Sequence, residues 1–195
     1  MRFIVLLSLF GATGAALLAE DRAPAPLSPP EWLIQSVSLR DDPASVAARF
    51  RTEVTRLRTG RLTTLAYYSD PIGAVHSNAD RDGHDHSGHV HGEADPCNAQ
   101  PAWSIQVRDG KLQSIIASPE TPVSLDVIKR FGLRELAAGQ VGGIGVQAWA
   151  LDGEQALVAI GVDRAKRTCG QWVLVWRSLL PLIYPELAKL IRNGE

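Results

Sequence analysis

The segment WSIQVRDGKLQSIIA, residues 103–117, carries the clearest structural signal of the chain. Apolar and polar side chains alternate before Asp109 and Gly110, and a second apolar run follows them. Alternation with a period of two is typical of a half-buried strand, and Asp-Gly between two such runs favours a tight turn. We therefore expect an antiparallel β-hairpin. The apolar residues of its two arms are Trp103, Ile105, Val107, Leu112, Ile115 and Ile116.

Further strands are predicted on both sides of this hairpin. Asp152 and Gly153 lie between the apolar runs VQAWAL and ALVAIGV, which predicts a second hairpin. The segment LTTLAYY, residues 62–68, is rich in strand formers. QWVLVW, residues 171–176, is a continuous apolar run of the kind found in buried strands. The glycines of AGQVGGIGV match no nucleotide-binding pattern, so we expect them to serve turns. They are Gly139, Gly142, Gly143 and Gly145.

Three helices are expected between and beyond these strands. Two aspartates precede Pro43, and apolar residues then recur every three or four positions, which predicts a helix over 43–58. Ser124 as an N-cap and Gly132 as a terminator predict a helix of two turns. The spacing of apolar residues in LLPLIYPELAKLIRNGE predicts a final amphipathic helix. The predicted fold class is α+β, a single small domain with antiparallel hairpins, an N-terminal helix and a C-terminal helix.

The N-terminus has the layout of a secretory signal peptide. Arg2 precedes an apolar run and a series of small residues, which predicts a signal peptide over 1–19 with cleavage after Ala19 or Ala16; an uncleaved anchor is the alternative. Residues 20–40 are expected to form a Pro-rich extended leader, and residues 41–195 the single domain. We expect no transmembrane span after processing and a periplasmic or secreted location.

The charge of the chain bears on its partners. The formal net charge is -1, with 20 basic and 21 acidic residues. This balance gives no electrostatic footprint for nucleic acid or for an anionic membrane surface. Neither is expected as a partner.

All five histidines lie in one short polar tract, and a long exposed loop is predicted at about residues 71–100. The histidines are His76, His84, His86, His89 and His91. The last four form two His-x-His pairs, and in an extended loop the alternate side chains of each pair lie on one side. His-rich tracts are a metal-binding composition. We expect these four imidazoles to bind one transition-metal ion, with His76 as a further ligand.

Acidic residues near the histidines extend the predicted ligand set. Asp85 and Glu93 can supply oxygen ligands or orient the imidazoles. Imidazole suits zinc, nickel, cobalt and copper, so the expected cofactor is zinc or one of the other three. A loop that must be ordered on binding favours moderate affinity, and we therefore expect the metal to be exchangeable.

The chain has two cysteines, Cys97 and Cys169. In an oxidising compartment paired thiols normally form a disulfide, so we predict a Cys97–Cys169 bond. The alternative is that Cys97 acts as a soft metal ligand beside the histidines, which would leave Cys169 as a free thiol.

Catalytic motifs are absent from the sequence. It contains no His-Glu-x-x-His and no Gly-x-Ser-x-Gly. With no histidine outside the loop, a Ser-His-Asp or Cys-His site requires the loop to supply its base. We therefore expect no enzyme activity and rank a metal-dependent enzyme third.

The His-rich loop resembles, in composition alone, those of exported zinc-handling proteins such as the periplasmic zinc-binding components of transporters. The resemblance covers only the loop, because the chain is too short for that two-lobed fold. The leading hypothesis is an exported metal chaperone or buffer whose partners are a transition-metal ion and a transporter component or apo-metalloprotein. The alternative is a non-enzymatic interaction or assembly module of an exported complex, in which the His-rich loop is incidental.

Overall fold

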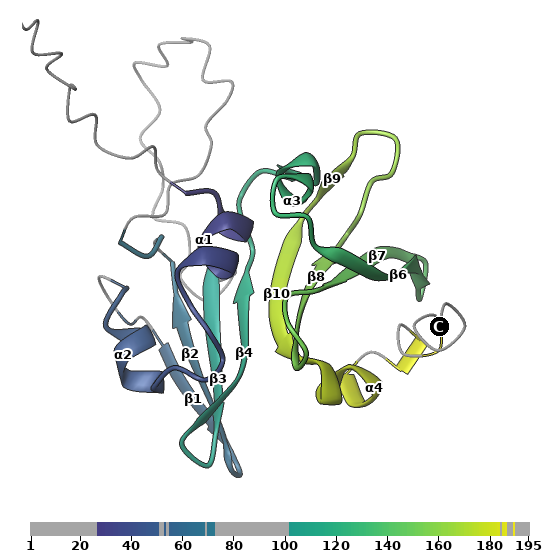
Figure 1. Cartoon of the computed structure of the whole chain (residues 1–195). Helices are drawn as coiled ribbons and strands as arrows, with labels where there is room; N and C mark the ends of the chain where they lie inside the picture. Colours follow the sequence, from purple (N-terminus) through teal and green to yellow (C-terminus); the bar gives the residue numbers. More distant parts are fainter. Residues whose placement is uncertain are drawn as a thin grey trace, which may run out of the picture.

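The protein is mostly β, with one eight-stranded antiparallel sheet and short helices in a single domain (Figure 1). The structure is a computed structural model that describes residues 27–50, 53, 55–68, 70–72, 102–183, 185, 186 and 189. All helices and strands named below lie within these residues.

The strands follow the order β1-β2-β3-β4-β10-β8-β7-β6 across the sheet. Their bounds are β1 Thr55–Thr59, β2 Leu62–Tyr67, β3 Trp103–Arg108, β4 Lys111–Ala117, β6 Arg134–Val141, β7 Ile144–Ala150, β8 Gln155–Ile160 and β10 Gln171–Trp176. A separate two-stranded sheet pairs β5 (Val123–Ser124) with β9 (Thr168–Cys169). The helices are α1 Pro29–Gln35, α2 Pro43–Ala47, α3 Asp126–Lys129, the 3-10 helix η1 Arg177–Leu179 and α4 Leu180–Ile183.

The sheet consists of two four-stranded meanders that meet at their last strands. One runs inward from β1 to β4, and the other runs inward from β6 through β7 and β8 to β10. The strands β4 and β10 pair antiparallel, with Leu174 opposite Ile115. The two meanders are therefore topologically equivalent, and each connection in one has a counterpart in the other.

The predicted hairpins and strands are confirmed. Asp109-Gly110 joins β3 to β4, and the Asp152-Gly153 turn joins β7 to β8. β6, for which no strand was predicted, forms a hairpin with β7 through Gly142 and Gly143, whose positive φ values of 56° and 82° fit the expected turn.

The central strands are buried on both faces of the sheet. In β10, Trp172 and Leu174 face a core that includes residues of α1, α2 and α3, whereas Val173 and Val175 face a second core with Leu180 of α4. Burial on both faces explains the continuous apolar run of this strand. The sheet is therefore covered by helices on the first face and by α4 on part of the second.

The predicted extended leader over 20–40 is wrong for its last part. Pro29 and Pro30 begin α1, where the missing N–H groups cost nothing because the first N–H groups of a helix have no partner within it. Trp32 and Leu33 are 1% and 0% exposed, so the helix belongs to the core. The prolines start this helix instead of preventing it.

The predicted helix over 43–58 is wrong beyond its first turn. Asp42 caps α2 by accepting the Ser45 N–H at 2.9 Å, but the helix ends at Ala47. Thr55–Thr59 instead forms β1, which pairs with β2 through a turn at Gly60, where φ is 60°. Pairing with a neighbouring strand therefore outweighs the local helical spacing.

The remaining helices are short. α3 has four residues, fewer than the two turns predicted, and its N-cap is Leu125 and not the predicted Ser124; Gly132 follows it with a φ of 59°. The predicted C-terminal helix begins as α4 at Leu180. No helix among the described residues is long and apolar enough to cross a membrane.

Candidate functional site

The predicted metal ligands lie outside the described residues, between Ile72 and Ala102. They are His76, His84, His86, His89, His91, Asp85 and Glu93. Cys97 and the predicted signal peptide over 1–19 lie outside the described residues as well. Metal binding, the disulfide and export therefore stay predictions. The structure does place the two points at which the His-rich segment leaves and rejoins the sheet.

Both ends of this segment are held by the fold. Tyr67, the last residue of β2, is the register partner of Trp103, the first residue of β3. Beyond the strand, the Ile72 N–H donates to the Arg49 carbonyl at 2.8 Å. At the other end the Ala102 carbonyl accepts the Ser118 N–H at 2.7 Å. The segment is therefore an insertion between two neighbouring, paired strands.

An aromatic cluster lies beneath the two ends. The ring of Trp103 is 5.1 Å from that of Trp32 and 5.8 Å from that of Phe50, both edge-on, and Phe50 stacks on Tyr67 at 4.2 Å. The Trp103 Nε1–H donates to the Asp70 carboxylate at 3.1 Å. Burial raises the pKa of Tyr67, and the charge of Glu53 acts in the same direction, so its hydroxyl stays protonated at neutral pH. The base of the insertion is therefore a packed platform.

The platform itself does not supply a metal site. Within the part of the chain that the structure describes, no group of three or more His, Cys, Asp or Glu side chains could hold a metal ion. Cys169 is 0% exposed, and burial raises the pKa of its thiol to about 12. A thiol in this state is a poor metal ligand because the thiolate is the form that binds.

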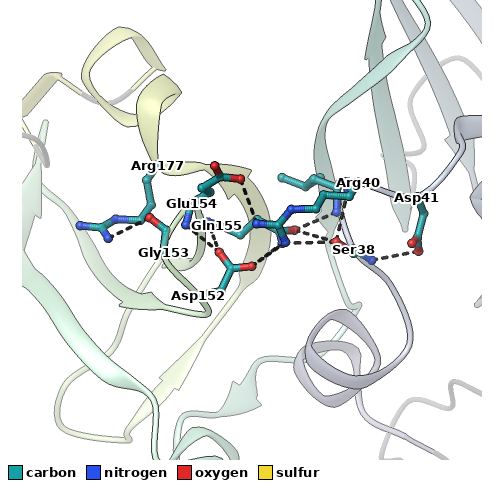
Figure 2. Close-up of polar contacts among 9 residues, drawn as sticks. Ser38, Arg40, Asp41, Asp152, Gly153, Glu154, Gln155 and Arg177 are labelled. Atoms are coloured by element: carbon teal, nitrogen blue, oxygen red, sulfur yellow. Dashed lines mark hydrogen bonds and ion pairs between the residues drawn. The ribbon is translucent and has the colours of Figure 1, made fainter.

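A second feature is a polar network at the turn between β7 and β8 (Figure 2). The Arg40 guanidinium contacts the Asp152 carboxylate at 2.8 Å and the Glu154 carboxylate at 2.9 Å. Asp152 also accepts the backbone N–H groups of Glu154 and Gln155 and the Gln155 side-chain amide. Gln155 in turn accepts the Leu39 N–H at 2.8 Å. The network joins the segment between α1 and α2 to the second meander.

The electrostatics of the network follow from its geometry. Burial opposes ionisation of Asp152, but the hydrogen bonds from Arg40, from two backbone N–H groups and from Gln155 outweigh it and hold the pKa of this carboxyl well below its usual range. The same two carboxylates raise the pKa of Arg40, chiefly through hydrogen bonds from its guanidinium. Every charged group named here has a partner, so the network fixes the segment in place.

A groove of about 840 Å³ opens beside this network. Its walls are the segment between α1 and α2, the start of β4 and the end of β10. Trp176 lines it, donates its Nε1–H to the Leu112 carbonyl at 2.7 Å and lies 5.8 Å from the Arg40 guanidinium. Charged residues line the groove as well, among them Asp41, Lys111 and Glu154. This site was not predicted from the sequence, because Arg40 was assigned to the leader.

Comparisons with protein-family models, with curated proteins and with solved structures gave no match.

Proposed function

We propose that this chain is an exported metal-binding protein that captures zinc, or a similar transition metal, and acts as a chaperone or buffer. The ligands would be the two His-x-His pairs of the insertion between β2 and β3, with Asp85, Glu93 and His76 as further donors. The recipient would be a metal transporter component or an apo-metalloprotein. This proposal depends on the chemistry of imidazole, which binds Zn(II) and its neighbours in the neutral form.

The observation that carries the proposal is the difference between two equivalent connections. In the second meander, β7 and β8 are joined by residues 151–154 alone. In the first meander the same connection, from β2 to β3, runs through residues 68–102 and contains every histidine of the chain. Closing the hairpin needs only a short turn, so most of the segment is not required by the fold. A segment that is not needed for folding supports a role in binding.

The scaffold fits this role. The segment starts and ends at paired strands above a packed aromatic cluster, so metal binding to it need not disturb the core. The mostly β domain would then present the segment to a recipient, and exchange would be rapid because the ligands come from one stretch of chain.

The groove beside Arg40 favours the second candidate, a non-enzymatic interaction or assembly module. Its volume of about 840 Å³ and its Trp176 wall would suit a short segment of a partner protein. In that case the histidines would be incidental, and removal of the insertion would leave partner binding unchanged.

The test is calorimetric titration of the purified protein with Zn(II), Ni(II) and Cu(II). Four chains are compared: the unchanged protein, one lacking residues 76–91, a quadruple Ala variant of the paired histidines, and a control. The quadruple variant replaces His84, His86, His89 and His91. The control replaces four other residues of the same tract by Ala, namely Ser77, Asn78, Ser87 and Val90.

Saturable binding in the sub-micromolar to micromolar range, retained by the control and lost in the other two variants, is the expected result. Equal binding by the unchanged protein and the quadruple variant would overturn the proposal. Circular dichroism of each variant shows whether the sheet is intact, so that loss of ligands and loss of fold are distinguished.

A further inference from the structure

A second groove, with a volume of about 670 Å³, lies between α3, the outer strands β6 and β7, and the loop that joins β8 to β9. It is separate from the groove beside Arg40, and none of its lining residues belongs to the His-rich insertion. Sites for small organic molecules have volumes on the order of 300–1,000 Å³. The size of this groove is therefore that of a small-molecule site.

The floor of the groove is apolar and fixed. Trp149 of β7 is 5% exposed, and Leu125 and Ile128 beside α3 are 8% and 3% exposed. The Trp149 ring lies 6.1 Å from that of Trp172, which is fully buried. Since these side chains pack into the main core, the floor exists before any ligand arrives.

The rim of the groove carries an excess of positive charge. Lys129, Arg164 and Arg167 line it, against one acidic residue, Glu135. Lys129 and Arg167 share a single oxygen of Asp126, at 3.0 and 2.8 Å. Among the described residues, Arg164 has no hydrogen-bond or ion-pair partner.

The loop that carries the two arginines is held in place. Asp163 and Thr168 exchange backbone hydrogen bonds of 2.8 and 3.2 Å, and the Arg167 carbonyl accepts the Leu125 N–H at 2.8 Å. Arg167 has a φ of 53°, a left-handed conformation that residues other than glycine rarely adopt. These bonds connect the loop to the start of α3, so the backbone positions that carry the two arginines are fixed beside the groove.

We infer that this groove binds a small amphipathic carboxylate. The apolar body of the ligand lies on Trp149 and Ile128, and its carboxylate pairs with Arg164. A guanidinium forms two parallel hydrogen bonds with a carboxylate, which gives such a ligand a defined orientation. This inference is independent of the metal-binding proposal, because it uses neither a histidine nor a metal ion.

The experiment is calorimetric titration of the purified full chain with decanoate as the probe and decan-1-ol as its uncharged counterpart. The first variant is Arg164→Gln, which removes the charge of an exposed side chain that has no hydrogen-bond or ion-pair partner among the described residues. Its matched control is Arg108→Gln, the same change at an exposed arginine on β3. A second variant, Ala138→Glu, places an acidic side chain at an exposed position that lines the groove.

We expect saturable binding of one decanoate per chain, with a Kd that rises about tenfold in Arg164→Gln, as expected for a hydrogen bond to a charged group. Arg108→Gln should bind as the unchanged protein does, Ala138→Glu should not bind, and decan-1-ol should bind at least tenfold more weakly than decanoate. An unchanged Kd in Arg164→Gln, or equal affinity for the alcohol, would overturn the inference. So would binding of an acidic peptide of alternating Glu and Leu by a protein that does not bind decanoate, since that would make the groove a protein-docking site.

Discussion

The backbone N–H of Leu39 donates a 2.8 Å hydrogen bond to the side-chain oxygen of Gln155, and both residues are 2% exposed. Gln155 begins β8, whereas Leu39 lies in the segment between α1 and α2. Both groups are buried away from water, so this hydrogen bond replaces the bonds that each group would otherwise make to water. Together with the ion pairs of Arg40, this bond connects the segment between α1 and α2 to the second meander.

Replacing Gln155 by Met should therefore lower the free energy of unfolding by about 1–3 kcal/mol. Methionine has a similar volume but a poor acceptor, so the buried Leu39 N–H is left without a partner. Chemical denaturation followed by tryptophan fluorescence measures the effect. The control is Gln140→Met on the exposed side of β6, which should change the stability by less than about 0.5 kcal/mol. Equal losses in the two variants would contradict the role of this bond.

Asp152 makes the stability of the protein vary with pH in the acidic range. Its pKa is lower in the folded chain than the value of about 3.9 expected when unfolded, so its ionised form stabilises the fold above that value. The contribution is lost as the pH falls from about 5 through 3.9 towards the folded pKa, because the unfolded state takes up the proton first.

The Asp152→Asn variant tests this dependence. We expect it to be less stable than the unchanged protein at pH 7, by on the order of 1 kcal/mol since the carboxylate is partly exposed. The difference should shrink by pH 3. Urea denaturation at both pH values measures it, with Asp109→Asn in the turn between β3 and β4 as the control. A difference that is constant between pH 7 and pH 3 would refute the assignment.

The insertion between β2 and β3 should be dispensable for folding. Replacing residues 73–101 by six Gly, Ser and Asn residues keeps the Tyr67–Trp103 pair and the contacts of Ile72 and Ala102. Shortening the loop reduces its closure entropy, which predicts a gain of about 1 kcal/mol. Denaturation is measured with a reductant, so that a Cys97–Cys169 bond contributes to neither chain. A loss of more than about 2 kcal/mol would show that the insertion takes part in the fold.

The sequence predicted the elements that depend on neighbouring residues. The turns at Asp109-Gly110 and Asp152-Gly153 are local signals, because each needs only two residues with favourable turn conformations between apolar runs. β1 was missed because its conformation depends on pairing with β2. α1 was missed because the prolines that start it were taken to exclude a helix.

The candidate sites divide in the same way. Composition alone points to the His tract, since no fold is needed to see five histidines together. The partners in the hydrogen bonds of Arg40 and Gln155 are more than a hundred residues apart in the sequence, so no local pattern predicts these bonds. The groove of Arg164 was also missed, because its walls come from α3, two strands and a loop that only the folded sheet brings together.

Gly145 has a different role from the neighbouring glycines, because it allows a close contact between two backbone segments. Gly142 and Gly143 form the predicted turn, but Gly145 lies within β7, where a Cβ would collide with the backbone carbonyl of Val162. The Gly145 carbonyl also accepts the Val162 N–H at 2.9 Å, so the two backbones cannot separate without losing this bond. The close approach places the loop that begins at Gly161 against the sheet.

Gly145→Ala should therefore lower the free energy of unfolding by about 1–3 kcal/mol, the usual cost of forcing extra volume into a packed contact. Gly153→Ala is the matched control. Its added Cβ would meet no atom within 4 Å, so reduced freedom of the unfolded chain should leave the stability unchanged or raise it by up to about 1 kcal/mol. Thermal and urea denaturation of both variants measure the difference. If the two changes had the same effect, the approach of Val162 to Gly145 would not be a determinant of the fold.

Because Val162 also lines the groove of Arg164, Gly145→Ala should weaken decanoate binding as well, whereas Gly153→Ala should not.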